Sequence, residues 1–357
     1  MKKLIISLLI LIAFPLASQA ETVHIDQKLS EQISIRADFT LPHVQEVQVL
    51  HAEMLQLNTE EYSLKMADRF FDETDSIMHD DFGSQDELFS YTGEFGRSKS
   101  VVSSKQGSFS YMDYALLQNG YNDPATYLLD KLYIAKFFPD FAVYTEEDVT
   151  YSHDNFPALE AQTIAKDTLS YIHNNDDYDF YPIYQYALSA EESQKIAFAN
   201  SYKYTDFDSD DNMYLFRFGL MLNDIPVVSA ENVVFHSETD IAPSHLYTDV
   251  YMSLREGIYM LNTRVLRISE TGSSKPILTP EQIIDAIDAH FDSLIPANEW
   301  KFTEAYLGYF PVRSASNQQM LEFIPVWCFS ATLVEDEVEY PDNRTFCFNA
   351  ITGELVR

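Results

Sequence analysis

Stretches in which apolar and polar residues alternate recur along this chain, and they constrain its fold more than any other feature. The alternation has the two-residue period of a half-buried β-strand. One such stretch, 33–41, ends before Pro42, and another is followed by the turn signal Asn223-Asp224. We predict strands at 33–41, near 47–55, at 213–220, and near 302–309, 321–333 and 344–350, with a hairpin over 250–261 that turns at 255–257.

Helix-capping signals predict helices between these strands. Thr59 can cap a helix whose first turn holds two glutamates. Ser189 with Glu192, and Thr279 with Gln282, have the spacing of capping boxes. We predict helices after these caps and over 124–137 and 157–172. A helix followed by several strands favours an α+β fold, with helices packed on antiparallel sheets, over a parallel sheet.

The pattern of a helix and then antiparallel strands occurs twice after residue 150, which suggests a repeat. We predict a smaller N-terminal α+β region over 21–150, a first helix-plus-antiparallel-sheet module over 151–270, and a C-terminal module over 271–357. Hydrophobic residues make up 46% of the 357 residues and aromatic residues 14%, a composition that supports real cores.

The first 20 residues have the pattern of a secretory signal peptide. Lys2 and Lys3 precede an apolar run over 4–14, and Ser18 and Ala20 supply the small residues that cleavage needs. A retained membrane anchor is the alternative, but a span needs about 20 apolar residues and this run is shorter. We expect cleavage after Ala20, no stable membrane anchor afterwards, and a soluble secreted or otherwise extracytoplasmic protein.

The charge of the chain is strongly acidic. It has 23 Lys and Arg against 56 Asp and Glu, a net charge of −33, and loss of the two leader lysines would make the charge −35. Nucleic acids and anionic membrane surfaces bind through lysine and arginine contacts to phosphate, so neither is an expected partner. An acidic surface suits solubility outside the cell, and it could also attract cations or basic partners.

The two cysteines, Cys328 and Cys347, each lie in an alternating, strand-like run. A turn signature, Tyr340-Pro341-Asp342-Asn343, lies between them, so the two runs can pair as a hairpin with the cysteines facing each other. In an oxidising compartment this arrangement favours a disulfide. Closing a loop of about 18 residues would stabilise the fold by roughly 3 kcal/mol.

The densest acidic cluster, 206–211, offers a candidate calcium site. Asp206, Asp208 and Asp210 alternate as the oxygen ligands do in the first half of a calcium loop. However, Asp211 stands where such a loop has glycine, and Arg217 where it has a bidentate glutamate. An acidic connecting loop is therefore the alternative, with calcium as the only suggested cofactor. The cluster over 174–179 is a poorer candidate of the same kind.

No catalytic motif is present in the sequence. The nine histidines are scattered without a zinc-binding spacing, and no G-x-S-x-G nucleophile turn occurs. With 56 acidic residues some carboxylate pair is always available, so a secreted hydrolase of glycan or peptide remains an alternative. A crowded tyrosine set could instead line a binding groove or fill sheet cores: Tyr171, Tyr178, Tyr181, Tyr184 and Tyr186.

The chain resembles an uncharacterised group of secreted proteins and lipoproteins of Firmicutes. The similar segments are 37–42 near the mature start and 214–227, and residues 279–354 look like PepSY and YycH/YycI-type extracytoplasmic modules. The lipoprotein members carry a cysteine at the cleavage site, and this chain does not. The resemblance implies a helix against an antiparallel sheet and a binding or regulatory role toward an envelope partner, and it carries over no catalytic residue.

We therefore expect a non-enzymatic extracytoplasmic protein that binds a protein or peptide partner. Either an exposed sheet edge or a tyrosine-rich groove would supply the contact surface. The hydrolase and the weak calcium-dependent binding module remain the alternatives.

Overall fold

The computed structural model describes residues 22–41, 43–71, 77–80, 88–93, 99–113, 152–174, 177–199, 207–228, 246–271, 273–292, 299–314, 317, 319–335 and 338–356. The predicted leader and the predicted helix over 124–137 lie outside these residues. The described fold is mixed but dominated by sheet, with 53% strand and four α-helices in this part of the chain. None of those helices combines the length and apolar character needed to cross a membrane.

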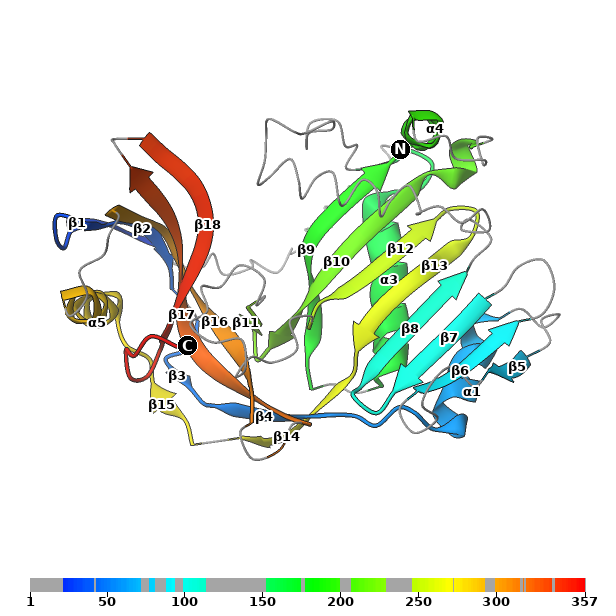
Figure 1. The fold of residues 1–357 in the computed structure, drawn as a ribbon, viewed down its shortest axis with the longest axis horizontal. Helices are drawn as coiled ribbons and strands as arrows, with labels where there is room; N and C mark the ends of the chain where they lie inside the picture. Colours follow the sequence, from blue (N-terminus) through cyan, green and yellow to red (C-terminus); the bar gives the residue numbers. More distant parts are fainter. Residues whose placement is uncertain are drawn as a thin grey trace, which may run out of the picture.

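The elements follow one another along the chain as Figure 1 labels them: β1 (Thr22–Lys28), β2 (Ile33–Thr40), β3 (Glu46–Val47), β4 (Leu50–Met54), α1 (Glu60–Phe70), β5 (Ile77–Asp80), β6 (Leu88–Gly93), β7 (Lys99–Ser104), β8 (Ser108–Asp113), α3 (Ala158–His173), β9 (Asp179–Leu188), α4 (Ala190–Ala199), the 3₁₀ turn η3 (Ser209–Asp211), β10 (Met213–Leu222), β11 (Ile225–Pro226), β12 (Thr248–Ser253), β13 (Gly257–Arg264), β14 (Leu266–Thr271), β15 (Lys275–Pro276), α5 (Pro280–Asp292), β16 (Glu299–Arg313), β17 (Met320–Glu335) and β18 (Val338–Asn349).

Two large sheets lie side by side in Figure 1. The seven-stranded sheet has the order β1-β2-β16-β17-β4-β14, with β18 also paired to β17. The nine-stranded sheet has the order β11-β10-β12-β13-β8-β7-β6-β5, with β9 also paired to β10. A short third sheet joins β15 to β3.

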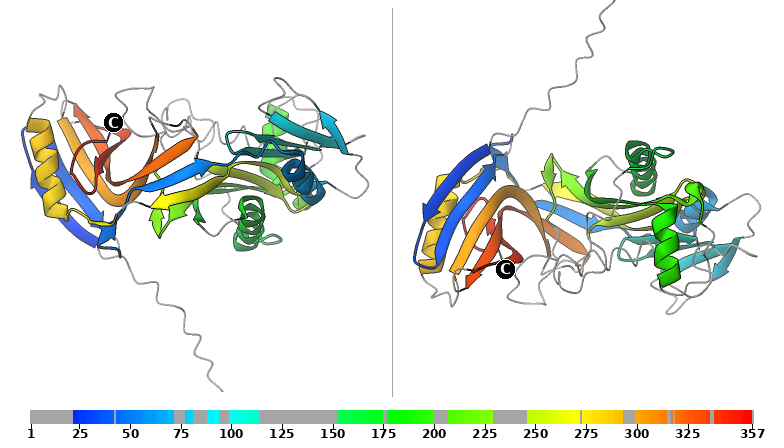
Figure 2. Two further views of the ribbon diagram at one scale, coloured as in Figure 1. Left: turned by 90° about the horizontal axis from the view of Figure 1, so that it is seen from below. Right: turned by 90° about the horizontal axis from the view of Figure 1, so that it is seen from above.

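The seven-stranded sheet is built from both ends of the chain. Its strands β1, β2 and β4 come from the first 54 residues, whereas β14 and β16–β18 follow residue 265. The pair β2–β16 is parallel, and the other pairs of this sheet are antiparallel. Figure 2 shows α5 lying beside β1 and β2. Ile283 and Ile287 of α5 are fully buried in one core cluster with Phe39, Trp327 and Phe329.

The nine-stranded sheet is largely a meander of neighbouring strands. From β5 to β8 each strand pairs with the next along the chain, and β12 pairs with β13 through the turn that we predicted at 255–257. Gly257 has a positive φ of 66°, a conformation that suits glycine in that turn. Helix α1 contacts β6 and β7, and α3 contacts β10. The Tyr62 hydroxyl of α1 donates to the Ile172 carbonyl of α3 at 3.4 Å, so the two helices are neighbours.

The two sheets are joined by hydrogen-bonded backbone. Asn223 and Asp224 form the predicted turn after β10, both with positive φ. The chain then passes through β11 to Val228, whose N–H donates to the Tyr309 carbonyl of β16 at 2.8 Å. This short connection fixes the end of one sheet against the middle of the other.

The predicted caps are confirmed in atomic detail. Thr59 accepts from the Tyr62 N–H at the start of α1. The Ser189 N–H donates to Glu192 and the Glu192 N–H to Ser189, as a capping box requires. The same reciprocal pair forms between Thr279 and Gln282 before α5.

The sheets cut across the predicted chain divisions. The nine-stranded sheet takes strands from both 21–150 and 151–270, and the seven-stranded sheet takes strands from all three ranges. The predicted domain limits therefore divide the sequence but do not separate the two sheets, because each sheet contains strands that are far apart along the chain. We also did not predict β1, β9 or β14.

Candidate functional sites

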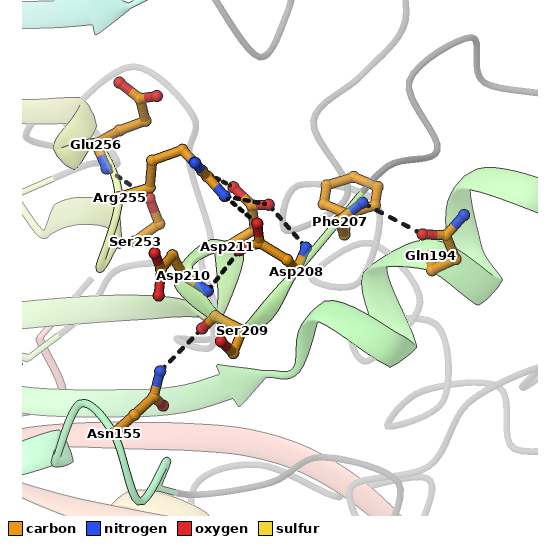
Figure 3. A network of polar contacts seen from close by, with 10 residues as sticks. All are labelled: Asn155, Gln194, Phe207, Asp208, Ser209, Asp210, Asp211, Ser253, Arg255 and Glu256. Carbon is orange, nitrogen blue, oxygen red and sulfur yellow. Dashed lines mark hydrogen bonds and ion pairs between the residues drawn. The ribbon is translucent and has the colours of Figure 1, made fainter.

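Two of the predicted calcium ligands, Asp208 and Asp210, lie at a short 3₁₀ turn before β10. Asp208 caps the turn, because its carboxylate accepts from the Asp210 N–H at 2.8 Å. The Asp211 carboxylate reaches back and accepts from the Asp208 N–H at 2.9 Å. Figure 3 shows these contacts, with Asn155 donating to the Ser209 carbonyl from the other side. The turn is therefore held by its own acidic side chains.

Arg255 of the β12–β13 turn neutralises two of these carboxylates (Figure 3). Its Nε donates to Asp211 at 2.8 Å and its Nη2 lies 2.6 Å from Asp208. The side chain of Asp211 is buried, whereas those of Asp208 and Arg255 are exposed. The hydrogen bond from the Asp210 N–H, and then Arg255, lower the pKa of Asp208. Both carboxylates therefore serve as ion-pair partners.

The structure describes only two of the three predicted calcium ligands, since Asp206 lies outside the described residues. Within those residues, no group of three or more histidine, cysteine or acidic side chains could hold a metal ion. A cation at Asp208 would compete with the Arg255 guanidinium. Calcium binding here stays a prediction, and the geometry supports the alternative of an acidic connecting turn.

The two cysteines face each other across the β17–β18 hairpin, as predicted. Cys328 and Cys347 are directly opposite in the register, and both are fully buried. Their sulfur atoms lie 3.7 Å apart, whereas a disulfide bond measures about 2.05 Å. Both thiols are free in this structure, so the predicted disulfide is not present in it.

The surroundings of this thiol pair make a poor nucleophile. Burial raises the pKa of Cys328, and the hydrogen bond with Cys347 raises it further. Tyr306 also hydrogen-bonds Cys328, and burial raises the pKa of Tyr306 as well. A thiol acts as a nucleophile only as its thiolate, and the raised pKa of Cys328 disfavours that form in the folded protein.

Among the four crowded tyrosines whose side chains are described, two fill the core, as the alternative to a groove predicted, and the set does not share one surface. Tyr178 and Tyr186 are buried, and Tyr171 is exposed on α3. The ring of Tyr181 lies against Gly219, where an added Cβ would come within 2.6 Å of it. Tyr181 and Tyr186 stand opposite Gly219 and Leu215 of β10 and share one face of the sheet, whereas Tyr171 lies on α3.

Tyr178 belongs to a buried polar network instead. Its hydroxyl lies 2.5 Å from Nδ1 of His173, and Nε2 of His173 lies 2.9 Å from the Thr263 hydroxyl. The Thr263 hydroxyl in turn lies 2.6 Å from that of Thr248. Burial lowers the pKa of His173 to about 3. Both ring nitrogens are engaged, so this histidine supports the fold as a neutral ring.

An exposed aromatic and two cations meet at the outer side of α1 and α3. Lys65 Nζ lies 4.8 Å and the Arg69 guanidinium carbon 5.7 Å from the ring centre of Tyr171. Tyr171 is 37% exposed, and Ile164, two turns earlier on α3, is 40% exposed. We call Lys65, Arg69, Ile164 and Tyr171 the Tyr171 patch. Sequence reasoning named Tyr171 but missed the cations, because only the neighbouring packing of α1 and α3 brings them together.

No family model matches this chain. No curated protein matches it either. Among solved structures it is similar to the crystal structure of an uncharacterized protein from Eubacterium rectale ATCC 33656, determined at 1.45 Å resolution. The two share 15% sequence identity with a TM-score of 0.57, over 95% of this chain and 96% of the other. At this identity the similarity shows a shared fold over nearly the whole length.

Proposed function

We propose that this chain is an exported, non-enzymatic binding or regulatory protein whose partner is a protein or peptide outside the cytoplasm. The Tyr171 patch is the observation that carries the proposal. It presents two cations around an exposed aromatic ring on a chain whose net charge is −33. Two cations beside an exposed aromatic ring suit an acidic partner, on a protein in which acidic residues outnumber basic ones by 56 to 23.

The chemistry of the patch defines the partner. Tyrosine and arginine are enriched among the residues that dominate binding energy, because a large ring buries area while the cation pairs with an acidic group. Lys65 and Arg69 would pair with a carboxylate, and the exposed faces of Ile164 and Tyr171 would contact an apolar side chain. The partner segment therefore combines an acidic residue with an apolar one.

The C-terminal part of the fold supports the resemblance to PepSY and YycH/YycI-type modules, which remains a proposal. The indole N–H of Trp327 on β17 donates to the Leu278 carbonyl just before α5 at 3.0 Å. The N–H of Leu278 donates to the Ala350 carbonyl after β18 at 2.8 Å. A helix tied in this way to β17 and β18 is the arrangement that the resemblance implies.

Export also bears on the thiol pair. We propose that Cys328 and Cys347 form their disulfide during folding in an oxidising compartment, before burial closes them to an oxidant. Two thiols would give up two protons and two electrons to a disulfide-bonded oxidase or to molecular oxygen. The non-bonded 3.7 Å separation then represents the reduced protein.

The hydrolase alternative lacks a comparable observation. Asp208 and Asp211 are close carboxylates, but both bind Arg255 and the pKa of Asp208 is lowered. A general acid for glycoside hydrolysis needs a raised pKa instead. These two carboxylates therefore do not form the acid–base pair that the alternative requires.

Site-specific photo-crosslinking tests the binding proposal. A photoreactive phenylalanine analogue replaces Tyr171 in one variant and Leu254 in a control, since Leu254 is similarly exposed, at 39%, on the β12–β13 turn. After expression in the source cells and irradiation, we expect a discrete adduct with one extracytoplasmic protein or peptide from position 171 alone. Equal adducts from both positions, or none from position 171, would contradict the proposal.

A further inference from the structure

β1 is an edge strand, and its outer side is open to another strand. It pairs with β2 over its whole length, from Thr22 opposite Thr40 to Lys28 opposite Ser34, without a register shift. Within the described residues it has no other strand partner. Edge strands commonly carry a proline, a bulge or charged side chains, lysine above all, that disfavour pairing. β1 has no proline and no bulge and carries its lysine, Lys28, only at its end, so its edge is free to accept another strand.

The hydrogen-bond pattern of the β1–β2 hairpin identifies which backbone N–H and C=O groups of β1 point away from β2. The Leu29 N–H donates to the Ile33 carbonyl at 3.0 Å, which marks this opposed pair as hydrogen-bonded. Alternate residues of an antiparallel pair then point the same way. The N–H and C=O groups of Val23, Ile25 and Gln27 point toward β2, and those of the even-numbered residues of β1 point outward.

The exposed face of the hairpin carries a ladder of charges. His24 Nδ1 lies 2.7 Å from the carboxylate of Asp38, directly across the hairpin. Two residues along, Arg36 Nε donates to Asp26 at 3.1 Å. β1 therefore offers one histidine and one acid, two residues apart, at two outward-bonding positions.

A second copy of β1 complements this strand when it runs antiparallel with Ile25 at the centre. That register places His24 opposite Asp26 of the partner subunit, and Asp26 opposite His24 of the partner subunit. These are the positions whose backbone groups point outward, so each opposed pair exchanges two hydrogen bonds. Across the junction the row reads Asp38, His24, Asp26 of the partner subunit, then Arg36 of the partner subunit, with acid and base alternating.

On the opposite face of β1, the same register brings the two Ile25 side chains together at the centre. Ile25 stands opposite Ala37 of β2, and Val23 opposite Phe39. Ala37 and Phe39 are fully buried, whereas Val23 and Ile25 are only partly buried against the same core. Two Ile25 side chains meeting at the two-fold axis would cover the apolar surface that one copy leaves exposed.

We infer that this protein forms a two-fold symmetric dimer through β1, which joins two seven-stranded sheets into one continuous sheet. The partner is a second copy because the charges of the strand are complementary to themselves in this register and Ile25 meets Ile25 at the centre. This interface is separate from the Tyr171 patch, which lies on α1 and α3, the helices that contact the nine-stranded sheet.

Sedimentation velocity with two charge variants tests the dimer. Asp26→Arg places arginine opposite His24 of the partner subunit, and His24→Asp places two aspartates in opposition. We expect the wild-type protein to sediment as a dimer and each variant to have a dimer dissociation constant at least about tenfold higher. An equimolar mixture of the two variants should recover a heterodimer. In it, one junction pair is the native histidine and aspartate, and the other pairs the introduced aspartate with the introduced arginine, so both pairs are favourable.

Matched controls separate dimer loss from unfolding. Asp167→Arg makes the same charge change at an exposed position on α3, and it should dimerise like the wild type. Circular dichroism and thermal melts check that each hairpin variant keeps its fold. A monomeric wild-type protein at high micromolar concentration, dimeric single variants, or a mixture that stays monomeric would each overturn the inference.

Discussion

The two sheets reach a buried core in different ways. The seven-stranded sheet joins strands from opposite ends of the chain. Its core is a network of aromatic rings, in which the ring centre of Phe302 lies 5.7 Å from that of Phe329 and 5.4 Å from that of Phe346. The nine-stranded sheet joins mostly sequence neighbours, and it buries the polar chain of His173, Thr263 and Thr248. The first core is a ring network of strands far apart in the sequence, and the second region, of neighbouring strands, contains a buried histidine.

This difference predicts different sensitivities. A core of aromatic rings responds to lost volume, and between pH 5.5 and 7.5 that response does not depend on pH, because phenylalanine rings do not titrate. A buried neutral histidine responds to acid, because the unfolded chain can bind a proton that the folded chain excludes. The perturbations below separate the two halves, in order of decreasing effect on the free energy of unfolding.

Truncation of a core ring gives the largest effect. Phe329→Ala removes a fully buried side chain of the seven-stranded sheet. We expect a loss of about 3–5 kcal/mol, because the surrounding rings cannot close the cavity. Urea unfolding at pH 5.5 and 7.5 should give the same loss at both values. A loss below about 1 kcal/mol would mean that the ring network is not tightly packed.

Reduction of a disulfide between Cys328 and Cys347 should weaken the same half. If the exported protein carries the Cys328–Cys347 disulfide, its mass is two hydrogens lower, and reduction costs roughly 3 kcal/mol of stability. Intact mass spectrometry and unfolding with and without reductant measure both quantities. Cys347→Ser should show no response to reductant. A wild-type mass with both thiols present would refute the disulfide.

Acid should weaken the nine-stranded half through His173. Its pKa is about 3 when folded and near 6.5 when unfolded, so the unfolded chain binds the extra proton between these values. Stability is therefore complete above pH 6.5 and falls as the pH drops below it, by about 2–3 kcal/mol at pH 4.5. In His173→Gln this part of the slope should disappear. Identical slopes for both proteins would show that His173 is not the acid-sensitive group.

The acidic turn should give the smallest effect. Asp211→Ala leaves the Asp208 N–H and Arg255 without their buried acceptor, and we expect a loss of about 1–2 kcal/mol. Asp210→Ala removes an exposed neighbouring carboxylate and should change stability by less than about 0.5 kcal/mol. Chemical denaturation compares the pair. Equal losses would mean that the ion pair with Arg255 does not hold the turn.

Local signals in the sequence predicted local structure well. The caps at Thr59, Ser189 and Thr279 depend on contacts within three residues, and all three form. The opposition of Cys328 and Cys347 followed from alternation in the two runs, but the turn predicted at 340–343 was wrong, because these residues lie within β18 and a register shift restores the pairing. Such features need no knowledge of the rest of the chain.

Long-range contacts were outside the reach of these signals. The parallel pairing of β2 with β16 joins residues more than 260 positions apart, and no pattern in either strand specifies it. Arg255 and Asp211 meet only because the β12–β13 turn lies beside η3. The calcium hypothesis counted the acids of the cluster and lacked this basic neighbour.

The binding proposal is tested most directly by the affinity of the partner captured at Tyr171. Isothermal titration compares the wild-type protein with a variant that carries both Lys65→Glu and Arg69→Glu, and with Leu254→Ala as a control. We predict at least about tenfold weaker binding for the double variant, with binding that weakens with salt in the wild type, and no change for Leu254→Ala. An unchanged dissociation constant in the double variant would contradict the assignment of the Tyr171 patch as the partner surface.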